Sequence, residues 1–306
     1  MKKAKSIIFL FITAITWGFA FVAQRVGAGY VEPLTFNAMR YMLGTLSLIP
    51  VIMIFEKEKY DKKKFFGTVK AGLIAGIVLT VAADIQQYVV VLTQSAGLSG
   101  FLTGLYIVLV PILGLLIFKK KTNILTWLGA MVAVVGLYFL CVDSNSTFSL
   151  SLGVLLLLGD AFVWALHIIV IDYYVEKVSP LKFAMIQFGV CGLLSLAGAL
   201  LFENIELSSV WDARVPILYG GIMSVGVAYT CQILGQRDAD PTFAAIVLST
   251  ESVFGAIGGA IILGERFVFP YGYIGCAFVF AGIIISQFTL KKKNKNKEPV
   301  YNKNKQ

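Results

Sequence analysis

Ten apolar stretches of about 20 residues, separated by short polar segments, constrain this chain more than any other feature. A helix needs about 20 mostly apolar residues to cross the hydrocarbon core of a bilayer. Hydrophobic residues make up 58% of the sequence, against about half in soluble proteins. The sequence therefore predicts an all-α integral membrane protein with ten transmembrane helices. They cover residues 6–24, 35–54, 67–91, 97–118, 124–142, 152–172, 182–202, 214–235, 242–263 and 271–289.

Basic residues gather on one side of these predicted spans. If the N-terminus lies in the cytoplasm, 22 of the 26 Lys and Arg residues fall in cytoplasmic segments. Arg25, Arg214 and Arg266 fall on the opposite side, and Arg40 falls inside a span. Because cytoplasmic loops carry an excess of Lys and Arg, we expect a multi-pass protein of the cytoplasmic (plasma) membrane with both termini in the cytoplasm. The net charge of +9 then reflects topology and contact with lipid headgroups, not nucleic-acid binding.

The two halves of the chain resemble each other at a nearly constant offset. Matching positions 146 or 147 residues apart are Trp17 and Trp164, Pro33 and Pro180, Phe36 and Phe183, and Gly129 and Gly275. Five helices is an odd number, so the second half must enter the membrane upside down, and the repeat has a five-plus-five inverted topology. Transporters use such repeats for alternating access. We expect repeats at 6–142 and 152–289, followed by a disordered basic cytoplasmic tail at 290–306.

Several short motifs resemble those of a known family. They are Trp17-Gly18, Pro33-x-x-Phe36-x-x-x-Arg40, and Leu263-Gly264-Glu265-Arg266 followed by Gly275 and Gly282. Together with the ten spans, they are similar to the drug/metabolite transporter superfamily, in particular its members with two EamA domains. The resemblance covers residues 6 to about 289. It implies a secondary carrier, often an exporter of amino acids or other metabolites, with its site in a central cavity between the halves.

The few ionisable side chains inside the spans are the main candidates for function. Each costs about 2.5–3.5 kcal/mol at the bilayer centre on insertion scales, so each needs an explanation. We expect Arg40, Asp84, Gln87, Tyr88, Asp160, Trp164, His167 and Glu251 to contact substrate. Milder polar or aromatic candidates for the cavity wall are Gln86, Gln232, Gln236, Trp17, Tyr106 and Tyr229.

Three of these candidates share one helix face. Asp160, Trp164 and His167 are spaced four and three residues apart in the sixth predicted span. Histidine titrates near neutral pH and can relay protons, so Asp160 and His167 are candidates for proton coupling. The alternatives are a packing histidine bonded to a carbonyl and an aspartate that only bonds to a neighbouring helix.

Glu251 is the third candidate for proton coupling. Desolvation favours the neutral form of a carboxyl, and the hydroxyls of Thr250 and Ser252 adjoin Glu251 in the chain. The alternative is a structural hydrogen bond. Arg40 and Asp84 are the natural salt-bridge pair on the outer side. They either neutralise each other, or Arg40 grips a substrate carboxylate that Asp84 helps to orient.

The motifs of other function classes do not occur in the sequence. It has no P-loop, no HExxH or GxSxG motif, and no metal-ligand spacing among its four cysteines and one histidine. We therefore expect no enzyme, cofactor or metal. The expected partners are a small-molecule substrate and membrane lipid, with the chain a monomer or homodimer. The expected function is transport of small organic metabolites such as amino acids. The alternatives are a multidrug or cationic-solute exporter and a non-transporting protein such as a lipid scramblase or receptor.

Overall fold

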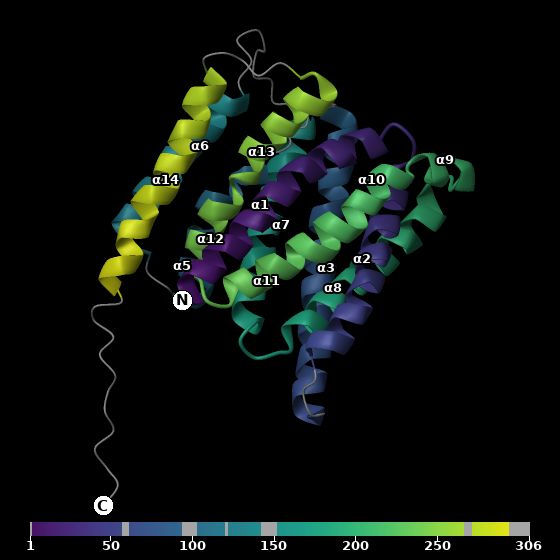
Figure 1. The fold of residues 1–306 in the computed structure, drawn as a ribbon, viewed down its shortest axis with the longest axis horizontal. Coiled ribbons are helices and arrows are strands. Elements are labelled where there is room, and N and C mark those ends of the chain that lie inside the picture. Colours follow the sequence, from purple (N-terminus) through teal and green to yellow (C-terminus); the bar gives the residue numbers. More distant parts are fainter. Residues whose placement is uncertain are drawn as a thin grey trace, which may run out of the picture.

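A computed structural model describes residues 2–56, 61–93, 103–119, 122–141, 152–265 and 271–293, and every regular element in these ranges is a helix. The long helices are α1 (Lys2–Gly27), α2 (Pro33–Phe55), α3 (Lys62–Thr93), α5 (Tyr106–Phe118), α6 (Ile124–Cys141), α7 (Leu152–Tyr174), α8 (Pro180–Phe202) and α14 (Tyr271–Lys293). They lie side by side in one bundle, with α6 and α14 along one flank and α2, α3 and α8 along the other (Figure 1).

The rest of the helical chain is built from shorter elements. A short helix, α9 (Leu207–Asp212), follows α8. Two composite segments come next. The first joins α10 (Arg214–Leu218), the π-helix η1 (Tyr219–Tyr229) and α11 (Thr230–Gln236), and the second joins α12 (Pro241–Leu248), α13 (Glu251–Gly258) and the π-helix η2 (Gly259–Leu263).

Membrane-spanning length and apolarity are confirmed for much of the predicted pattern. Among the described residues, six helical segments are long and apolar enough to cross a bilayer: Ala4–Gly27, Pro33–Phe55, Lys62–Leu92, Pro180–Phe202, Arg214–Gln236 and Pro241–Leu263. Each contains one predicted span. Shorter apolar helices lie within three more, at Tyr106–Ile117, Ile124–Phe139 and Tyr273–Ser286, and α7 contains the predicted span 152–172.

The helix ends at two predicted boundaries, near residues 97 and 290, are not matched by the described part of the chain. The predicted span 97–118 begins among residues 94–102, which lie outside the described part of the chain. At the other end of the sequence, α14 continues to Lys293, so residues 290–293 are helical and do not belong to the tail predicted at 290–306. The helix continues beyond the end of the apolar run, because lysine has a high helix propensity and needs no apolar surroundings.

Two antiparallel helix pairs organise the bundle. The end of α8 contacts the start of α2, and the start of α8 contacts the end of α2. In the α6–α14 pair, a Cβ atom at Gly129 would lie 2.6 Å from the carbonyl oxygen of Gly282, and one at Gly136 would lie 2.7 Å from that of Gly275. Because only glycine leaves room at these crossings, the two backbones pack in direct contact.

The bundle has an apolar exterior and a polar interior. Met53, Phe55, Leu201 and Phe202 expose 73–79% of their surface near helix ends. The side chains of Arg40, Gln87, Asp160, His167, Gln187 and Glu251 are buried. A water-soluble bundle has the opposite distribution, so this arrangement fits a protein whose outer surface faces lipid.

Candidate functional site

A small internal cavity lies where α1, α2, α3, α5, α7, η1, α11 and α13 come together. It is lined by Trp17, Ala20, Phe21, Gln24, Arg40, Gln86, Thr103, Tyr106, Trp164, Ile168, Ser224, Tyr229, Gln232 and Glu251. The space open to the centre of a water-sized sphere is about 20 Å³, which suits a few water molecules but not an organic solute. A solute can therefore enter only if the surrounding helices move apart.

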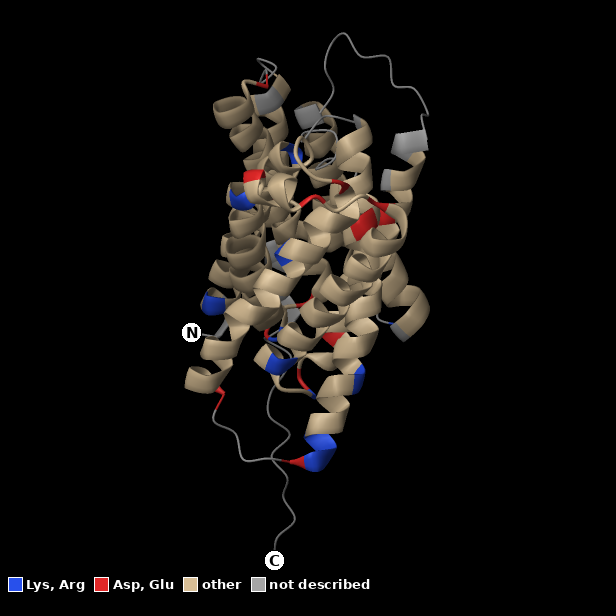
Figure 2. Ribbon diagram, turned by 90° about the vertical axis from the view of Figure 1, so that its right-hand side faces the viewer, with Lys and Arg blue, Asp and Glu red and all other residues tan. Residues whose placement is uncertain are grey.

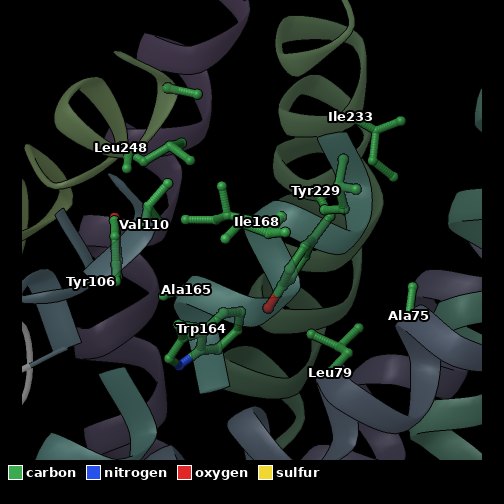
Figure 3. Close-up of a cluster of buried hydrophobic side chains, with 14 of the residues drawn as sticks. Ala75, Leu79, Tyr106, Val110, Trp164, Ala165, Ile168, Tyr229, Ile233 and Leu248 are labelled. Carbon is green, nitrogen blue, oxygen red and sulfur yellow. The ribbon is translucent and has the colours of Figure 1, made fainter. Parts of the chain in front are cut away.

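Aromatic rings form one wall of the cavity. Trp17 and Trp164, which occupy matching positions in the two halves, lie with ring centroids 6.2 Å apart, and Tyr229 contacts both at 4.6 Å and 6.3 Å. Figure 3 shows Trp164 and Tyr229 side by side near Ile168. The Trp17 indole donates a hydrogen bond to the Ser224 carbonyl at 3.3 Å. Such rings offer flat apolar faces and a favourable surface for cations.

Glu251 enters the cavity because its helix is interrupted immediately before it. The α-helix α12 ends at Leu248 and α13 begins at Glu251. The hydroxyls of Ser249 and Thr250 donate to the carbonyls of Ile246 and Val247 at 2.8 Å and 2.7 Å. These side chains compete with the regular backbone bonds of the helix.

A matching interruption lies in the first half of the chain. The residues preceding α5 and α13, Leu105 and Thr250, share the same backbone angles, φ −64° and ψ −11°. The first residues of the two helices then meet, because the Tyr106 hydroxyl donates to Glu251 Oε1 at 3.1 Å. Interrupted helices at matching positions are a mark of substrate sites in transporters.

Asp160 lies behind this meeting point. It is fully buried in α7, and the polar side chains near it are those of Trp164, Thr103 and Glu251. Within the described part of the chain, neither carboxyl oxygen of Asp160 has a hydrogen-bond partner, nor do Trp164 Nε1 and Thr103 Oγ1. A charged carboxylate without partners is very costly to bury, so this cluster suits a neutral carboxyl, or one that a proton or ligand completes.

Arg40 brings a positive charge to the same cavity. The side chain is 2% exposed, its guanidinium lies over the ring of Tyr41 at 4.7 Å, and Nε donates to Asn37 Oδ1 at 2.8 Å. Asn37 Nδ2 in turn donates to Asp84 Oδ1 at 2.7 Å. The expected Arg40–Asp84 pair is therefore bridged by an amide. Arg40 Nη2 has no hydrogen-bond partner among the residues described, so it can still bind an acceptor.

The other predicted site residues lie outside the cavity lining. Asp84 faces α8, where it accepts a hydrogen bond from Ser195 Oγ at 2.8 Å. His167 is buried with Nε2 3.1 Å from Gln187 Oε1, and the Gln87 side-chain amide donates to the Gln24 carbonyl at 3.3 Å. Tyr88 is 53% exposed and borders a separate cleft of about 520 Å³ at one end of the bundle.

Three neutral polar residues at the cavity were missed by sequence reasoning. Gln24, Thr103 and Ser224 line it, whereas the neutral polar candidates from the sequence that line it are Gln86 and Gln232. The available signal was a glutamine near the end of an apolar run, which is unusual because its amide must find partners in the membrane. Gln24 Oε1 has none in the described ranges.

The family model and the similar proteins point to the same family of membrane proteins. Residues 4–142 and 151–288 each match the EamA-like transporter family. An uncharacterized transporter of Archaeoglobus fulgidus is 25% identical over 93% of this chain and 86% of its own length. The uncharacterized transporter YoaV of Bacillus subtilis is 20% identical over 94% and 98%. A WAT1-related protein of Arabidopsis thaliana is 28% identical over 47% of this chain and 38% of its own.

A solved crystal structure has the same fold. It covers 95% of this chain and 99% of the other chain with a TM-score of 0.74, at 15% sequence identity. The family matches extend over nearly the whole sequence, and the predicted resemblance to transporters with two EamA domains is confirmed. The chain is thus a multi-pass membrane protein that belongs to the EamA-like transporter family.

Proposed function

We propose that this protein is a secondary carrier, active or facilitative, that moves small organic solutes by alternating access around the central cavity. The observation that carries the proposal is the meeting of two interrupted helices at Tyr106 and Glu251, inside a buried cavity lined by both halves of the chain. A cavity of about 20 Å³ represents a closed state. Opening it toward one side and then the other moves a bound solute across the membrane.

The proposed architecture is ten spanning helices in two inverted repeats, 6–142 and 152–289. Helix contacts support it, because the main contacts within the bundle have counterparts with the halves exchanged. The packing of α2 on η1 corresponds to that of α8 on α3, and α1 on α13 corresponds to α7 on α5. The pairs α2–α8 and α6–α14 each join an element to its own counterpart. Such symmetry gives two equivalent conformations, open to opposite sides.

The charges at the cavity favour a solute that carries both signs. Arg40 offers Nη2 to an acceptor such as a carboxylate. Glu251, with Asp160 behind it, offers a negative group to an amine. The proposed substrates are therefore amino acids or related metabolites, and export is the proposed direction. Asp84 serves in this scheme by orienting Arg40 through Asn37.

Proton coupling is proposed for the buried acids. Glu251 lines the cavity, whereas Asp160 is buried outside its lining, and neither carboxyl oxygen of Asp160 has a hydrogen-bond partner among the described residues. A proton on either carboxyl removes the charge that would otherwise have to cross the membrane interior. His167 is the third proposed member, because its Nδ1 lacks a partner within the described residues.

The proposed location is the plasma membrane, with both termini in the cytoplasm. The start of α3 carries Lys62, Lys63 and Lys64, the basic turn at the lower end in Figure 2. Lys182 lies at that same end, beside Glu56 at the end of α2. This end faces the cytoplasm if the positive-inside rule sets the orientation.

A second candidate function is export of organic cations. The aromatic wall of Trp17, Trp164 and Tyr229 beside Glu251 favours it, because rings and a carboxylate together attract a desolvated cation. In that case Arg40 has only a structural role, as part of the network with Asn37.

Solute flux into proteoliposomes tests both functions. Purified protein is assayed with a panel of zwitterionic amino acids, amines and cationic dyes, alongside Arg40→Ala and Glu251→Gln. We expect flux of a zwitterion, with Arg40→Ala weakening its apparent affinity about tenfold or more, since a charge-assisted hydrogen bond is worth about 1.5–3 kcal/mol.

Other outcomes separate the alternatives. If cations alone are transported and Arg40→Ala leaves their affinity unchanged, the cation exporter is correct. If no solute crosses under any gradient while labelled lipid does, the protein is a scramblase and both transport proposals fail. A matched control is Arg214→Ala, which removes an exposed arginine that bonds to the neighbouring Trp211 carbonyl and stacks on its ring.

A further inference from the structure

The cleft of about 520 Å³ lies at the end of the bundle opposite the basic turn of α3. It includes the start of α9, which is at the upper end of the bundle in Figure 1. The charged side chains among its lining residues are those of Glu32 and Glu206, and both are acidic. Under the proposed orientation this cleft faces the outside of the cell, and its charge attracts a positively charged group.

A thin layer of the bundle separates this cleft from the central cavity. Trp17, Gln24 and Ala28 follow one another along one face of α1; the first two line the cavity, and Ala28 lines the cleft. The four residues from Gln24 to Ala28 correspond to about 6 Å along the helix. On α3, Gln86 lines the cavity and Tyr88 lines the cleft. Along α1, the two spaces are therefore about one helical turn apart.

A pair of glutamines joins α1 and α3 at this layer. The Gln87 side-chain amide donates to the Gln24 backbone carbonyl at 3.3 Å. Gln24 is 4% exposed and Gln87 is fully buried, yet neither side-chain oxygen has a hydrogen-bond partner in the described part of the chain. Because the Gln24 carbonyl must face the nitrogen of the Gln87 amide, the oxygen of that amide is left as an acceptor. The layer therefore holds two buried acceptors that lack a donor.

The cavity is closed in a different way on its cytoplasmic side. Leu10 lies two turns before Trp17 on α1, and it belongs to one cluster of buried apolar side chains. Members of this cluster from four helices are at most 3% exposed: Leu10, Ile171, Ile233 and Phe243. The Thr13 hydroxyl also donates to the Ala228 carbonyl at 2.8 Å and so joins α1 to η1. Opening this side must break apolar packing, whereas the glutamine layer has less to break.

We propose that the side-chain oxygens of Gln24 and Gln87 form a transit site for the ammonium group of the solute, between Glu251 and the cleft. When α1 and α3 separate at this layer, the two oxygens accept hydrogen bonds from the ammonium group as it passes. A charged donor satisfies buried acceptors that have no other partner. The inference rests on the proposed carrier function and deepens it, because it names the route and the solute group that is recognised along it.

Modification of a cysteine in the cavity tests the proposal. The four native cysteines are replaced by alanine, and Ser224→Cys provides a reporter that lines the cavity. Proteoliposomes of one orientation are treated from the cleft side with aminoethyl methanethiosulfonate, which carries an ammonium group, or with the anionic sulfonatoethyl methanethiosulfonate. A thiol scavenger inside the vesicles removes reagent that crosses the lipid. Each rate is divided by the rate of the same reagent with mercaptoethanol, and the readout is the ratio of the ammonium rate to the anion rate.

Three variants separate recognition of the ammonium group from opening of the layer. Gln24→Leu removes one acceptor but keeps the bond between α1 and α3, because the Gln24 backbone carbonyl accepts that bond. Gln87→Leu removes the other acceptor and the bond together. The control is Gln236→Leu on α11, outside the cavity lining. Gln236 is also buried, its amide donates to the Ile168 carbonyl at 3.2 Å, and its side-chain oxygen lacks a partner among the described residues.

We expect the ammonium reagent to be favoured about tenfold or more in the background protein, as for a charge-assisted hydrogen bond. Gln24→Leu should lower this ratio about threefold or more without speeding the anionic reagent. Gln87→Leu should speed both reagents, the anionic one more, because α1 and α3 are no longer joined. Gln236→Leu should change neither the ratio nor the rates. Monodisperse elution in detergent shows that each variant is folded.

The outcomes separate the transit site from the proposed function. If Gln24→Leu and Gln87→Leu fold, exchange amino acid in counterflow and keep the background ratio, the transit site is wrong and the carrier function stands. A ratio near one in the background protein also overturns the transit site. If the ratio falls as expected but no solute is exchanged, the transit site is correct and the proposed transport is wrong.

Discussion

Asn37 holds together two charged side chains at the edge of the cavity. Its amide oxygen accepts from Arg40 Nε and its amide nitrogen donates to Asp84 and to the Ala83 carbonyl, at 2.7–2.9 Å. The residue is fully buried. Because the Asn37 amide is neutral, it can bond to Arg40 through its oxygen and to Asp84 through its nitrogen. It thereby fixes the orientation of the Arg40 side chain without neutralising its charge.

Replacing Asn37 should therefore destabilise the protein more than replacing an ordinary buried hydroxyl. We expect Asn37→Leu to lower the free energy of unfolding by about 2–3 kcal/mol, because it leaves the buried Arg40 Nε without its acceptor and removes one of the hydrogen bonds to Asp84, which keeps its bond from Ser195. The measurement is thermal unfolding in detergent. The control is Thr45→Val on the same helix, whose half-buried hydroxyl bonds to the Tyr41 carbonyl one turn earlier. Equal losses of unfolding free energy in the two variants would show that the Asn37 bridge contributes no more stability than a single hydroxyl hydrogen bond.

Sequence reasoning at the residue scale found the charges but not their partners. Three of the residues that the sequence proposed for the site, Arg40, Trp164 and Glu251, line the cavity. An ionisable or large aromatic residue in an apolar run needs a polar or packed environment. Asn37 and Thr103 were not singled out. Their role depends on which way each helix is rotated and which helix faces it, and the apolar pattern of a helix buried on most sides does not define a face.

Helix interruptions are the main feature at the scale of elements. The sequence predicted continuous spans at 214–235 and 242–263, and both are helical over those lengths but divided into several pieces. In the first, an 11-residue π-helix packs on α2, where Gly221 contacts Leu43 and Gly44 contacts Val225. These divisions depend on packing against α2 and on local hydroxyl bonds. Both are invisible to hydropathy, which registers only the continuous apolar run.

The glycine crossings of α6 and α14 give a prediction at this scale. Gly129→Ala should lower stability by about 1–3 kcal/mol, because its Cβ would lie 2.6 Å from the Gly282 carbonyl and the backbones must separate. Gly114→Ala is the control. It also lies in a helix, but nothing is within 4 Å of its Cβ, so it should be neutral or stabilise by up to about 1 kcal/mol. Loss of stability in both variants would mean that helix crossing is not the cause.

At the scale of the whole molecule, the repeat explains why the site lies where it does. Trp17 meets Trp164, and Tyr106 meets Glu251, because counterpart elements of the two halves approach each other at the centre of the bundle. The offset in sequence predicted two related halves, but it did not predict which helices pair. That pairing is decided by close contacts such as Gly76 against Val190, which join residues more than 100 positions apart.

In the proposed mechanism, the protein carries solute by alternating access, and buried acids bind protons. Counterflow in sealed proteoliposomes tests it most directly. Labelled amino acid outside is measured while unlabelled amino acid inside drives exchange, between about pH 5 and pH 8, in wild type and in Glu251→Gln and Asp160→Asn. We predict saturable, trans-stimulated uptake that depends on pH in wild type and loses that dependence in both variants. Uptake that is absent, or present without trans-stimulation, would contradict the carrier, and variants that follow the wild-type pH profile would contradict the coupling.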